Sequence, residues 1–187
     1  MKTRKKIIIT LIIICILIGI LILPEKIMKN FYKTTYSEFV YEYSNKYNVD
    51  PYLIFAIIKA ESGFDKNAIS NSEAKGIMQI MENTAVELAN ELEVEYLENE
   101  TLFDVEKNIM LGTKYISKLL KEYDGNTILA LLAYNAGMGN VENWIEEGII
   151  RKDGTDIENV PFKETKSYTR KILRDYKTYL NLYINNF

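Results

Sequence analysis

One carboxylate occupies a position where the surrounding pattern predicts an apolar side chain. Glu61 shares one face of a predicted helix with three isoleucines, Ile54, Ile57 and Ile58. We therefore expect its side chain to be at least partly buried. Glu61 also lies in the last turn, where the helix dipole disfavours negative charge. Burial and the dipole both raise a carboxyl pKa, which makes Glu61 a candidate general acid near neutral pH. The alternative is a glutamate at a frayed helix end that turns back to solvent.

The composition excludes several other catalytic chemistries. The 187 residues contain no His and a single Cys, Cys15. Without His there is no Ser–His or Cys–His nucleophile pair and no His-ligated metal. One Cys can form neither a thiolate zinc site nor an internal disulfide. Catalysis is therefore left to carboxylates, Tyr, Lys or Ser, and no metal is expected.

A nearly continuous apolar run at 7–23 predicts a membrane segment. At about 1.5 Å per residue the run is roughly 25 Å long, a little under the hydrocarbon thickness of a bilayer. A cleaved signal peptide is the alternative, but the residues around the end of the run, LILPEK at 21–26, include none of the small residues typical of a cleavage site. We expect an uncleaved anchor. Cys15 within it is interpreted as an apolar filler, with palmitoylation as the alternative.

The charge distribution predicts the topology of this anchor. Four basic residues precede the run and indicate an amino terminus inside the cell, although the second flank also carries lysines, at Lys26, Lys29 and Lys33. The rest of the chain would then lie outside. The chain has 23 Lys and Arg against 26 Asp and Glu. Because four of the basic residues precede the anchor, the outer part is acidic, which argues against a nucleic-acid partner.

The sequence after the anchor has helical periodicity almost throughout. Predicted helices lie near 36–47, 51–62 and 85–92, from 104 to about 123, and at 127–135, 141–147 and 165 to about 183. Asp50 before Pro51 is typical of a helix start, and Gly63 and Gly137 of helix ends. Strand-like alternation is scarce, and the polar stretch 148–160 is either a surface loop or a small hairpin. The predicted fold is one mainly α-helical domain.

Several motifs in this order resemble the catalytic domains of soluble lytic transglycosylases. They read AESGF at 60–64, AIS at 68–70, GIMQI at 76–80, AYNAG at 133–137 and PFKET at 161–165. Asn108-Ile109, Gly112, Tyr115 and Tyr168 resemble parts of the family's later helices, so the likeness covers about residues 38–183. The resemblance, to glycoside hydrolase family 23, implies a lysozyme-like helical fold with a substrate cleft that cleaves peptidoglycan glycan strands.

The resemblance also implies a reaction that needs one carboxylate and no cofactor. Glu61 matches the family's catalytic glutamate, which protonates the oxygen of the β-1,4 bond after N-acetylmuramic acid. As a carboxylate, it would then accept the proton of the sugar's own 6-hydroxyl, which attacks C1 and leaves a 1,6-anhydro end. An internal nucleophile removes the need for the second carboxylate of most glycosidases. The alternatives are a hydrolytic muramidase on the same fold and a non-catalytic wall-binding module.

Further site residues follow from the resemblance alone. The implied substrate-binding residues are Ser70, Met78, Gln79, Tyr134, Asn135 and Tyr168, with Glu164 as a supporting residue. The residue types also permit structural roles: Ser70 as a loop hydroxyl, Met78 as core, Gln79 as a satisfied amide and Asn135 as a helix cap. Glu73 departs from the pattern, because many family members carry Gly there. A Glu73 side chain in the cleft would raise the pKa of Glu61 further.

Together these features predict a single-pass protein of the cell membrane. Its segments are a basic cytoplasmic amino terminus at 1–6, an anchor at 7–23, a juxtamembrane linker at 24–35 and a lytic transglycosylase domain at 36–187. The domain is expected to be extracytoplasmic, with peptidoglycan glycan strands and, through the anchor, the membrane as partners.

Overall fold

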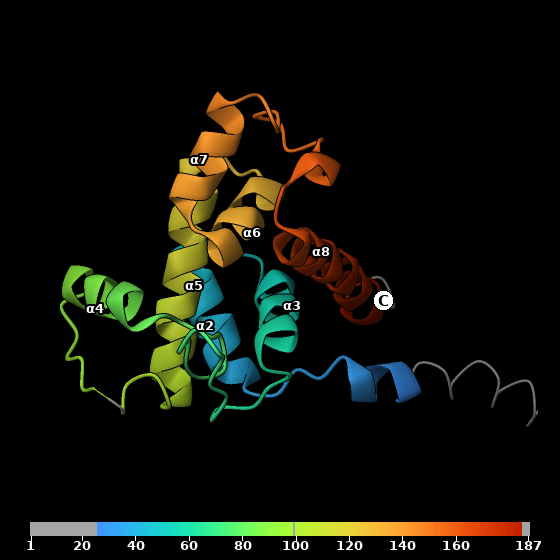
Figure 1. Ribbon diagram of the computed structural model, residues 1–187. Helices are drawn as coiled ribbons and strands as arrows, with labels where there is room; N and C mark the ends of the chain where they lie inside the picture. Colours follow the sequence, from blue (N-terminus) through green and yellow to red (C-terminus); the bar gives the residue numbers. More distant parts are fainter. Residues whose placement is uncertain (1–25, 99, 185–187) are drawn as a thin grey trace, which may run out of the picture.

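A computed structural model describes residues 26–98 and 100–184, which are mainly helical (Figure 1). The chain is helical at 26–31 and then forms α2 (Ser37–Tyr47), α3 (Pro51–Glu61), α4 (Glu82–Glu91), α5 (Val105–Glu122), α6 (Thr127–Ala136), α7 (Met138–Glu146), the 3-10 helix η1 (Ile157–Asn159) and α8 (Lys163–Tyr183). The described part contains no strand, only isolated antiparallel bridges that Lys75 forms with Ile69 and Ile80. The mainly α-helical prediction is therefore confirmed.

The predicted helices are all present, with shifted boundaries. α4, α7 and α8 each begin two or three residues before the predicted start. The stretch 148–160 forms turns and η1, so the loop is observed and the hairpin is not. Predicted segments 1–6 and 7–23 lie outside the described residues. Within the described ranges, no helix combines the length and hydrophobicity needed to span a bilayer.

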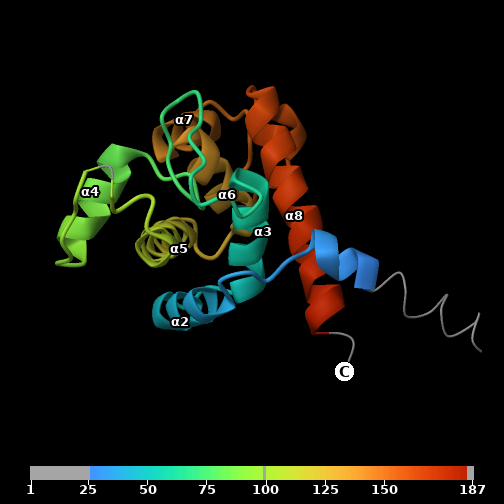
Figure 2. The same cartoon turned by 90° about the horizontal axis from the view of Figure 1, so that it is seen from below.

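α3 is the buried central helix that places the candidate acid. The Asp50 side chain accepts a hydrogen bond from the Tyr52 backbone N–H at 2.8 Å, and Pro51 occupies the first helical position, where its missing N–H costs nothing. Six consecutive residues, 53–58, are buried. Figure 2 shows why: α8 lies along one side of α3 and α2 along another, so the helix has little contact with water. Only its ends reach the surface.

The loop between α3 and α4 is fastened to α5 by a buried asparagine. Asn108 accepts a hydrogen bond from the Met78 backbone N–H at 2.8 Å and donates to the carbonyl oxygens of Lys75 and Leu102. The side chain is fully buried, so these three bonds offset the cost of removing a polar amide from water. The loop therefore has a fixed position beside the carboxyl end of α3.

The described part of the predicted linker 24–35 is attached to the domain. Its helical residues 26–31 lie beside α8 in both views, and the Tyr32 hydroxyl donates to Asp175 at 3.0 Å. Because Asp175 belongs to the buried face of α8, this segment shares the packing of the domain.

Candidate active site

Glu61 is the last residue of α3 and faces the long carboxyl-terminal helix. The Tyr168 hydroxyl on α8 donates a hydrogen bond to Glu61 Oε1 at 2.5 Å. The Glu61 side chain is partly exposed, so one edge remains accessible to a ligand. Its neighbour Ser62 holds the helix end in place by donating to the Ile77 backbone oxygen at 2.8 Å and accepting from the Phe64 N–H at 3.1 Å. The candidate acid is thus positioned by both α8 and the following loop.

Burial raises the pKa of the Glu61 carboxyl to about 7. The hydrogen bond from Tyr168 and the positive charge of Lys171 both lower this pKa, but the desolvation of the carboxylate outweighs them. Lys171 lies one turn after Tyr168 on α8, where its Nζ donates to the Ala60 backbone oxygen at 3.2 Å. Near neutral pH, Glu61 is therefore present in both protonated and ionised forms, as a group that donates and then recovers a proton requires.

Two tyrosines beside Glu61 remain phenols at neutral pH. Burial, and then the nearby Glu61 charge, hold the pKa of both Tyr134 and Tyr168 well above the ordinary value of 10. The Tyr134 hydroxyl donates to the Met78 backbone oxygen at 2.9 Å, and its ring lies 5.2 Å from the ring of Tyr115. Neither hydroxyl can serve as a base in this state, so both act as hydrogen-bond donors.

The loop 68–80 presents the amide of Gln79 next to the acid. Gln79 Nε2 donates to the backbone oxygens of Ala68 and Gly76 at 3.0 and 2.8 Å. These bonds hold the residue in the left-handed region, at φ 51°, which is uncommon for a residue other than Gly. Neither bond uses the amide oxygen, which leaves an acceptor at the wall of the cleft.

Ser70 and Met78 have structural contacts in this loop. Ser70 Oγ accepts from the backbone N–H groups of Ser72 and Ala74, at 3.2 and 3.0 Å, and so shapes the turn. The Met78 side chain is fully buried against α5, where a Cβ added at Gly112 would lie 2.4 Å from the Met78 sulfur. The structure places Met78 in the core, one of the two roles that the sequence permits, and its side chain does not line the cleft.

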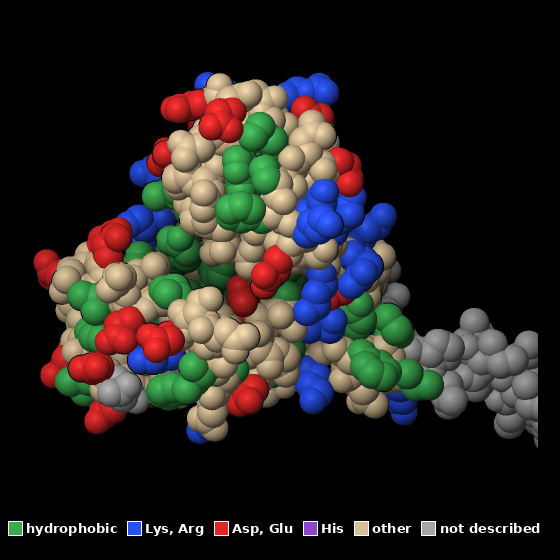
Figure 3. Space-filling view, in the orientation of Figure 1, with side chains coloured by type: hydrophobic (Ala, Val, Ile, Leu, Met, Phe, Trp, Pro, Cys, Tyr) green, Lys and Arg blue, Asp and Glu red, His purple; other side chains and the backbone are tan. Residues whose placement is uncertain are grey.

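Glu61 and several of its neighbours border a cleft of about 450 Å³. Its lining residues are Glu61, Ser70, Ser72, Ala74, Gln79, Met81, Tyr134, Asn135, Ala136, Phe162, Glu164 and Thr165. In Figure 3 the same face of the molecule is hollowed between its upper and lower parts, with acidic side chains at the hollow. Glu61 is the partly buried carboxylate of this lining, because Glu164 is exposed. The cleft thus combines one desolvated acid with aromatic, amide and hydroxyl groups.

Of the residues predicted for the site, the structure brings six to the cleft wall: Glu61, Ser70, Gln79, Tyr134, Asn135 and Glu164. Tyr168 reaches the site through its bond to Glu61. Glu73 is exposed and does not belong to the lining. Its φ of 64° explains why glycine suits this position.

A larger cavity, of about 540 Å³, lies between α2 and the start of α3. Its carboxylate, Asp50, caps α3 and also accepts from the Tyr176 hydroxyl at 2.7 Å. Asp50 therefore has a structural role, and the smaller cleft is the better candidate for chemistry. Among the residues that the structure describes, no group of three or more His, Cys, Asp or Glu side chains is arranged to hold a metal ion.

Three residues that shape the site had no individual role predicted from the sequence, although two of them, Ser62 and Phe162, lie within the quoted motifs. Ser62 and Lys171 fix the end of α3, and Phe162 forms an exposed apolar rim whose ring packs edge-on against Trp144 at 5.1 Å. The position of Ser62 directly after the candidate acid was a usable signal. Lys171 had none, because its contact with Ala60 joins residues 111 positions apart.

Comparison with known proteins identifies a family that the sequence matches. Residues 38–156 match the family model described as Transglycosylase SLT domain. The sequence is 31% identical over 140 residues to the soluble lytic murein transglycosylase of Escherichia coli K12, an alignment covering 74% of this chain and 22% of that protein. It is 36% identical over 133 residues to the membrane-bound lytic murein transglycosylase C of Edwardsiella ictaluri, with 66% and 36% covered.

Solved structures show the same relationship. An inactive glutamate-to-glutamine mutant of the lytic transglycosylase Slt from Pseudomonas aeruginosa superposes with a TM-score of 0.76 at 29% identity, over 82% of this chain and 25% of that protein. The soluble lytic transglycosylase of Escherichia coli superposes with a TM-score of 0.74 at 26% identity. The chain spans about a quarter of the length of these soluble proteins.

Proposed function

This chain belongs to the transglycosylase SLT domain family, and from that membership we propose that it is a lytic transglycosylase acting on peptidoglycan glycan strands. The observation that carries the proposal is the Glu61 carboxyl, which lines the cleft with a pKa of about 7 and a hydrogen bond from Tyr168. A carboxyl group in this state is suited to general acid catalysis at the pH of the cell envelope.

In the proposed first step, protonated Glu61 donates its proton to the oxygen that joins N-acetylmuramic acid to the next N-acetylglucosamine. The C1–O bond breaks, the protonated sugar leaves as an alcohol, and positive charge develops at C1 and the ring oxygen. The Gln79 amide oxygen and the Tyr134 ring lie in the same lining as Glu61 and are available to support this charge and orient the sugar.

In the second step, the 6-hydroxyl of the same N-acetylmuramic acid attacks C1. Glu61, now a carboxylate, accepts the hydroxyl proton and returns to its starting state. The new bond closes a 1,6-anhydro ring, and no water is consumed. Tyr168 keeps one carboxylate oxygen in place during both transfers, since its own pKa lies too far above neutrality for it to exchange the proton.

The lining of the cleft supports a mechanism with one essential carboxylate. Glu164, the second carboxylate of the lining, is exposed to solvent and belongs to the first turn of α8. A sugar hydroxyl already bound beside C1 acts as an intramolecular nucleophile, which is equivalent to a very high local concentration. The second carboxylate of most glycosidases is then unnecessary. We assign Glu164 and Asn135 to substrate contact at the cleft edge.

The proposal includes anchoring through the apolar run 7–23, with the amino terminus inside the cell and the domain outside, where peptidoglycan lies. The basic residues before the run support this orientation, and similarity to a membrane-bound transglycosylase supports attachment to a membrane. Mass spectrometry of the cell-associated protein should find a chain that retains residues 7–23. A mature amino terminus beginning after residue 23 would contradict the anchor.

The decisive experiment is digestion of purified peptidoglycan by the detergent-solubilised full chain in water enriched with oxygen-18. Hydrolysis places one solvent oxygen in every new reducing end, whereas attack by the 6-hydroxyl places none. We expect products that lack the label and are one water lighter than hydrolysis products of the same strands. A chelator should leave the rate unchanged, because the proposed steps use only protein and sugar groups.

Two variants control this experiment. Glu61→Gln should abolish turnover by several orders of magnitude, because the amide keeps the shape of the side chain but cannot transfer the proton. Glu73→Gln removes an exposed carboxylate that lies outside the cleft lining and should retain activity. Labelled reducing ends would identify a hydrolytic muramidase, and absence of any product from the wild-type chain would identify a non-catalytic binding module.

A further inference from the structure

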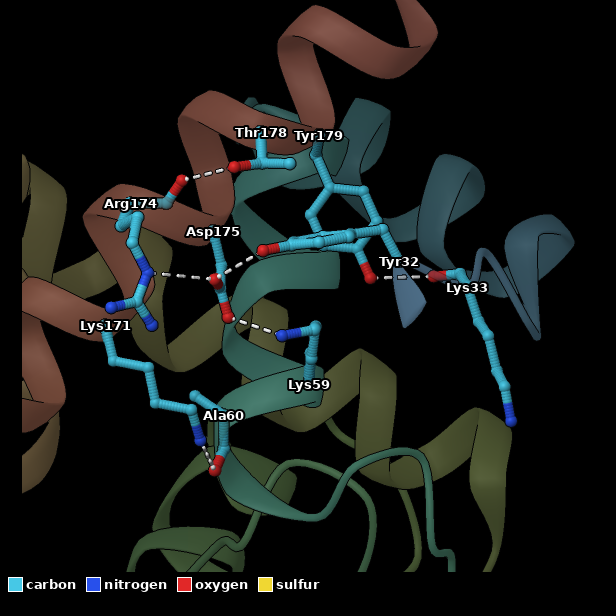
Figure 4. A network of polar contacts seen from close by, with 9 residues as sticks. All are labelled: Tyr32, Lys33, Lys59, Ala60, Lys171, Arg174, Asp175, Thr178 and Tyr179. Atoms are coloured by element: carbon cyan, nitrogen blue, oxygen red, sulfur yellow. Dashed lines mark hydrogen bonds and ion pairs between the residues drawn. The ribbon is translucent and has the colours of Figure 1, made fainter. Parts of the chain in front are cut away.

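The segment that follows the predicted anchor is fastened to α8 by a buried ion-pair network (Figure 4). Asp175, which is 1% exposed, accepts from the Tyr32 hydroxyl at 3.0 Å and from Lys59 Nζ at 2.7 Å. Lys59 Nζ also lies 4.5 Å above the centre of the Tyr32 ring. Because Lys59 belongs to α3 and Tyr32 to the segment, this buried carboxylate ties both to α8, and loss of Lys59 would leave the desolvated charge without its nearest cation.

Two further tyrosines of α8 hold the backbone of the same segment. The Tyr179 hydroxyl donates to the Lys33 carbonyl oxygen at 2.8 Å, and the Tyr183 hydroxyl donates to the Tyr32 carbonyl oxygen at 2.7 Å. The rings of Tyr32 and Tyr179 meet edge-on at 5.2 Å. Residues 26–33, which we call the mount, are therefore docked on the domain and are not a flexible tether.

The outward side of this mount is apolar and cationic. Ile27, Met28 and Phe31 are 49%, 36% and 68% exposed, although they follow the predicted anchor directly. Lys26 and Lys33, also exposed, flank them. Large apolar residues beside lysines are typical of segments that lie in the interface of a membrane.

α8 continues this surface with a row of positive charges. Its basic residues recur every three or four positions and therefore share one helical face: Lys163, Lys166, Arg170, Arg174 and Lys177. Arg170 and Arg174 are 51% and 71% exposed; Arg170 pairs with Glu158, and Arg174 Nε lies 3.6 Å from Oδ1 of the buried Asp175. In Figure 3, Lys and Arg side chains gather along the α8 flank, next to hydrophobic side chains where the described chain begins.

We propose that this surface, made of residues 26–33 and the cationic row of α8, binds the anionic lipid surface of the membrane that holds the anchor. The inference rests on the anchor included in the proposed function. Two observations favour a membrane as the partner: the mount begins three residues after the apolar run, and its charge is opposite to that of anionic headgroups in a chain whose net charge is −3. The apolar side chains would enter the interface while the lysines and arginines contact phosphates.

Membrane contact on this face would leave the cleft open. The cationic row lies on the opposite side of α8 from Tyr168 and Ile172, which face the domain. Because Asp175 ties the mount to α3, whose last residue is Glu61, the orientation of the mount also sets that of the cleft. The domain would then work on glycan close to the bilayer and not sample the whole wall.

The test uses the full chain reconstituted in nanodiscs of phosphatidylcholine, with or without an equal share of phosphatidylglycerol, carrying a nitroxide quencher on the lipid headgroups. Ser167→Trp introduces a fluorophore beside the cationic row, 144 residues after the apolar run in sequence. Val86→Trp, on α4 at the far side of the molecule, is the matched control at a 37% exposed position. Native Trp144 is 5% exposed and contributes the same background to both.

In the nanodiscs with phosphatidylglycerol we expect about twofold stronger quenching at position 167 than at position 86, lost in high salt or on adding Arg170→Glu with Lys177→Glu, two row positions that do not contact Asp175. The inference would be overturned by equal quenching at the two positions. It would also be overturned if quenching at position 167 were the same with and without phosphatidylglycerol. Failure of the wild-type chain to copurify with nanodiscs would instead overturn the anchor. Activity on soluble glycan fragments tests the proposed chemistry separately and should be unchanged by the paired charge reversal.

Discussion

The Tyr168 hydroxyl donates to Glu61 Oε1 at 2.5 Å and so connects residues 107 positions apart at the end of one helix and the first turns of another. The bond favours the ionised form of Glu61, yet burial still raises the carboxyl pKa to about 7. The two effects have different origins: the first depends on one hydroxyl and the second on the packing of α3. Substitutions can therefore separate them.

Tyr168→Phe should lower kcat/KM and shift its pH dependence. The ring keeps its packing, but the hydrogen bond that positions Glu61 is lost, which corresponds to a fall of about 10- to 100-fold for a bond of about 1.5–3 kcal/mol to a charged group. Because that bond lowers the pKa of Glu61, its removal raises the pKa. The alkaline limb of kcat/KM, where the acid form of Glu61 is lost, should move to higher pH.

Tyr176→Phe is the matched control, because Tyr176 also donates from α8 to a carboxylate, that of Asp50, but outside the cleft. It should cost stability and leave the pH profile in place. If Tyr168→Phe behaves in the same way, Tyr168 does not position the acid.

Glu61→Gln should stabilise the fold at neutral and higher pH. A carboxyl with a pKa raised from 4.5 to about 7 is favoured in its protonated form, so its contribution to stability is full below pH 4.5 and is lost as the pH rises through 7. A shift of this size corresponds to about 3 kcal/mol. Urea unfolding should give a difference between variant and wild type that grows from pH 4.5 to pH 7 and then stays constant. A difference independent of pH would mean that the pKa of Glu61 is not raised.

Lys171→Met should move the pH profile and, as a smaller effect, lower the maximum rate through loss of its bond to the Ala60 oxygen. Lys171 lowers the pKa of Glu61 through its charge, and its methylene chain can be replaced by that of Met. Without the charge, Glu61 keeps its proton to higher pH and the alkaline limb of kcat/KM rises. Lys177→Met, on the outer face of α8, provides the control and should leave the limb in place. A shift toward lower pH would contradict the assigned role of Lys171.

The helices and the burial of Glu61 could be predicted because both depend on local patterns. Asp50 and Pro51 define the start of α3, and the spacing of Ile54, Ile57 and Ile58 places Glu61 on their face. These signals lie within one helix, so no knowledge of tertiary structure is needed. The raised pKa followed from the same position.

The role of Met78 could not be settled, because it depends on a contact made across the fold. Met78 and Gln79 are neighbours in one motif, but Gly112 on α5 makes the space that the Met78 side chain fills. The direction of the Glu73 side chain, into the cleft or toward solvent, could not be predicted either, because a residue at positive φ in a loop gives no periodic signal. The Ser70 hydroxyl accepts hydrogen bonds from backbone N–H groups of its own turn, a local arrangement that a serine in any loop could adopt.

Gly76→Ala should be the most disruptive single-methyl change in the loop beside the cleft. Gly76 has a φ of 78°, and a Cβ there would lie 2.0 Å from the Leu102 backbone oxygen and 2.3 Å from Asn108 Nδ2. The methyl group would force apart the bonds by which Asn108 holds the loop, while the positive φ adds strain of about 1–2 kcal/mol. Overpacking of this kind costs about 1–3 kcal/mol more.

Gly125→Ala separates these two causes. Gly125 has a similar φ of 82°, but a Cβ there meets nothing within 4 Å, so only the backbone strain remains. Urea or thermal unfolding should therefore show a larger loss of stability for Gly76→Ala than for Gly125→Ala. Activity at a temperature where both variants stay folded should fall only for Gly76→Ala, because displacement of the loop moves Gln79 away from Glu61. Equal losses of stability in the two variants would show that the loop can yield to the methyl group, and would remove Asn108 as the residue that fixes the cleft wall.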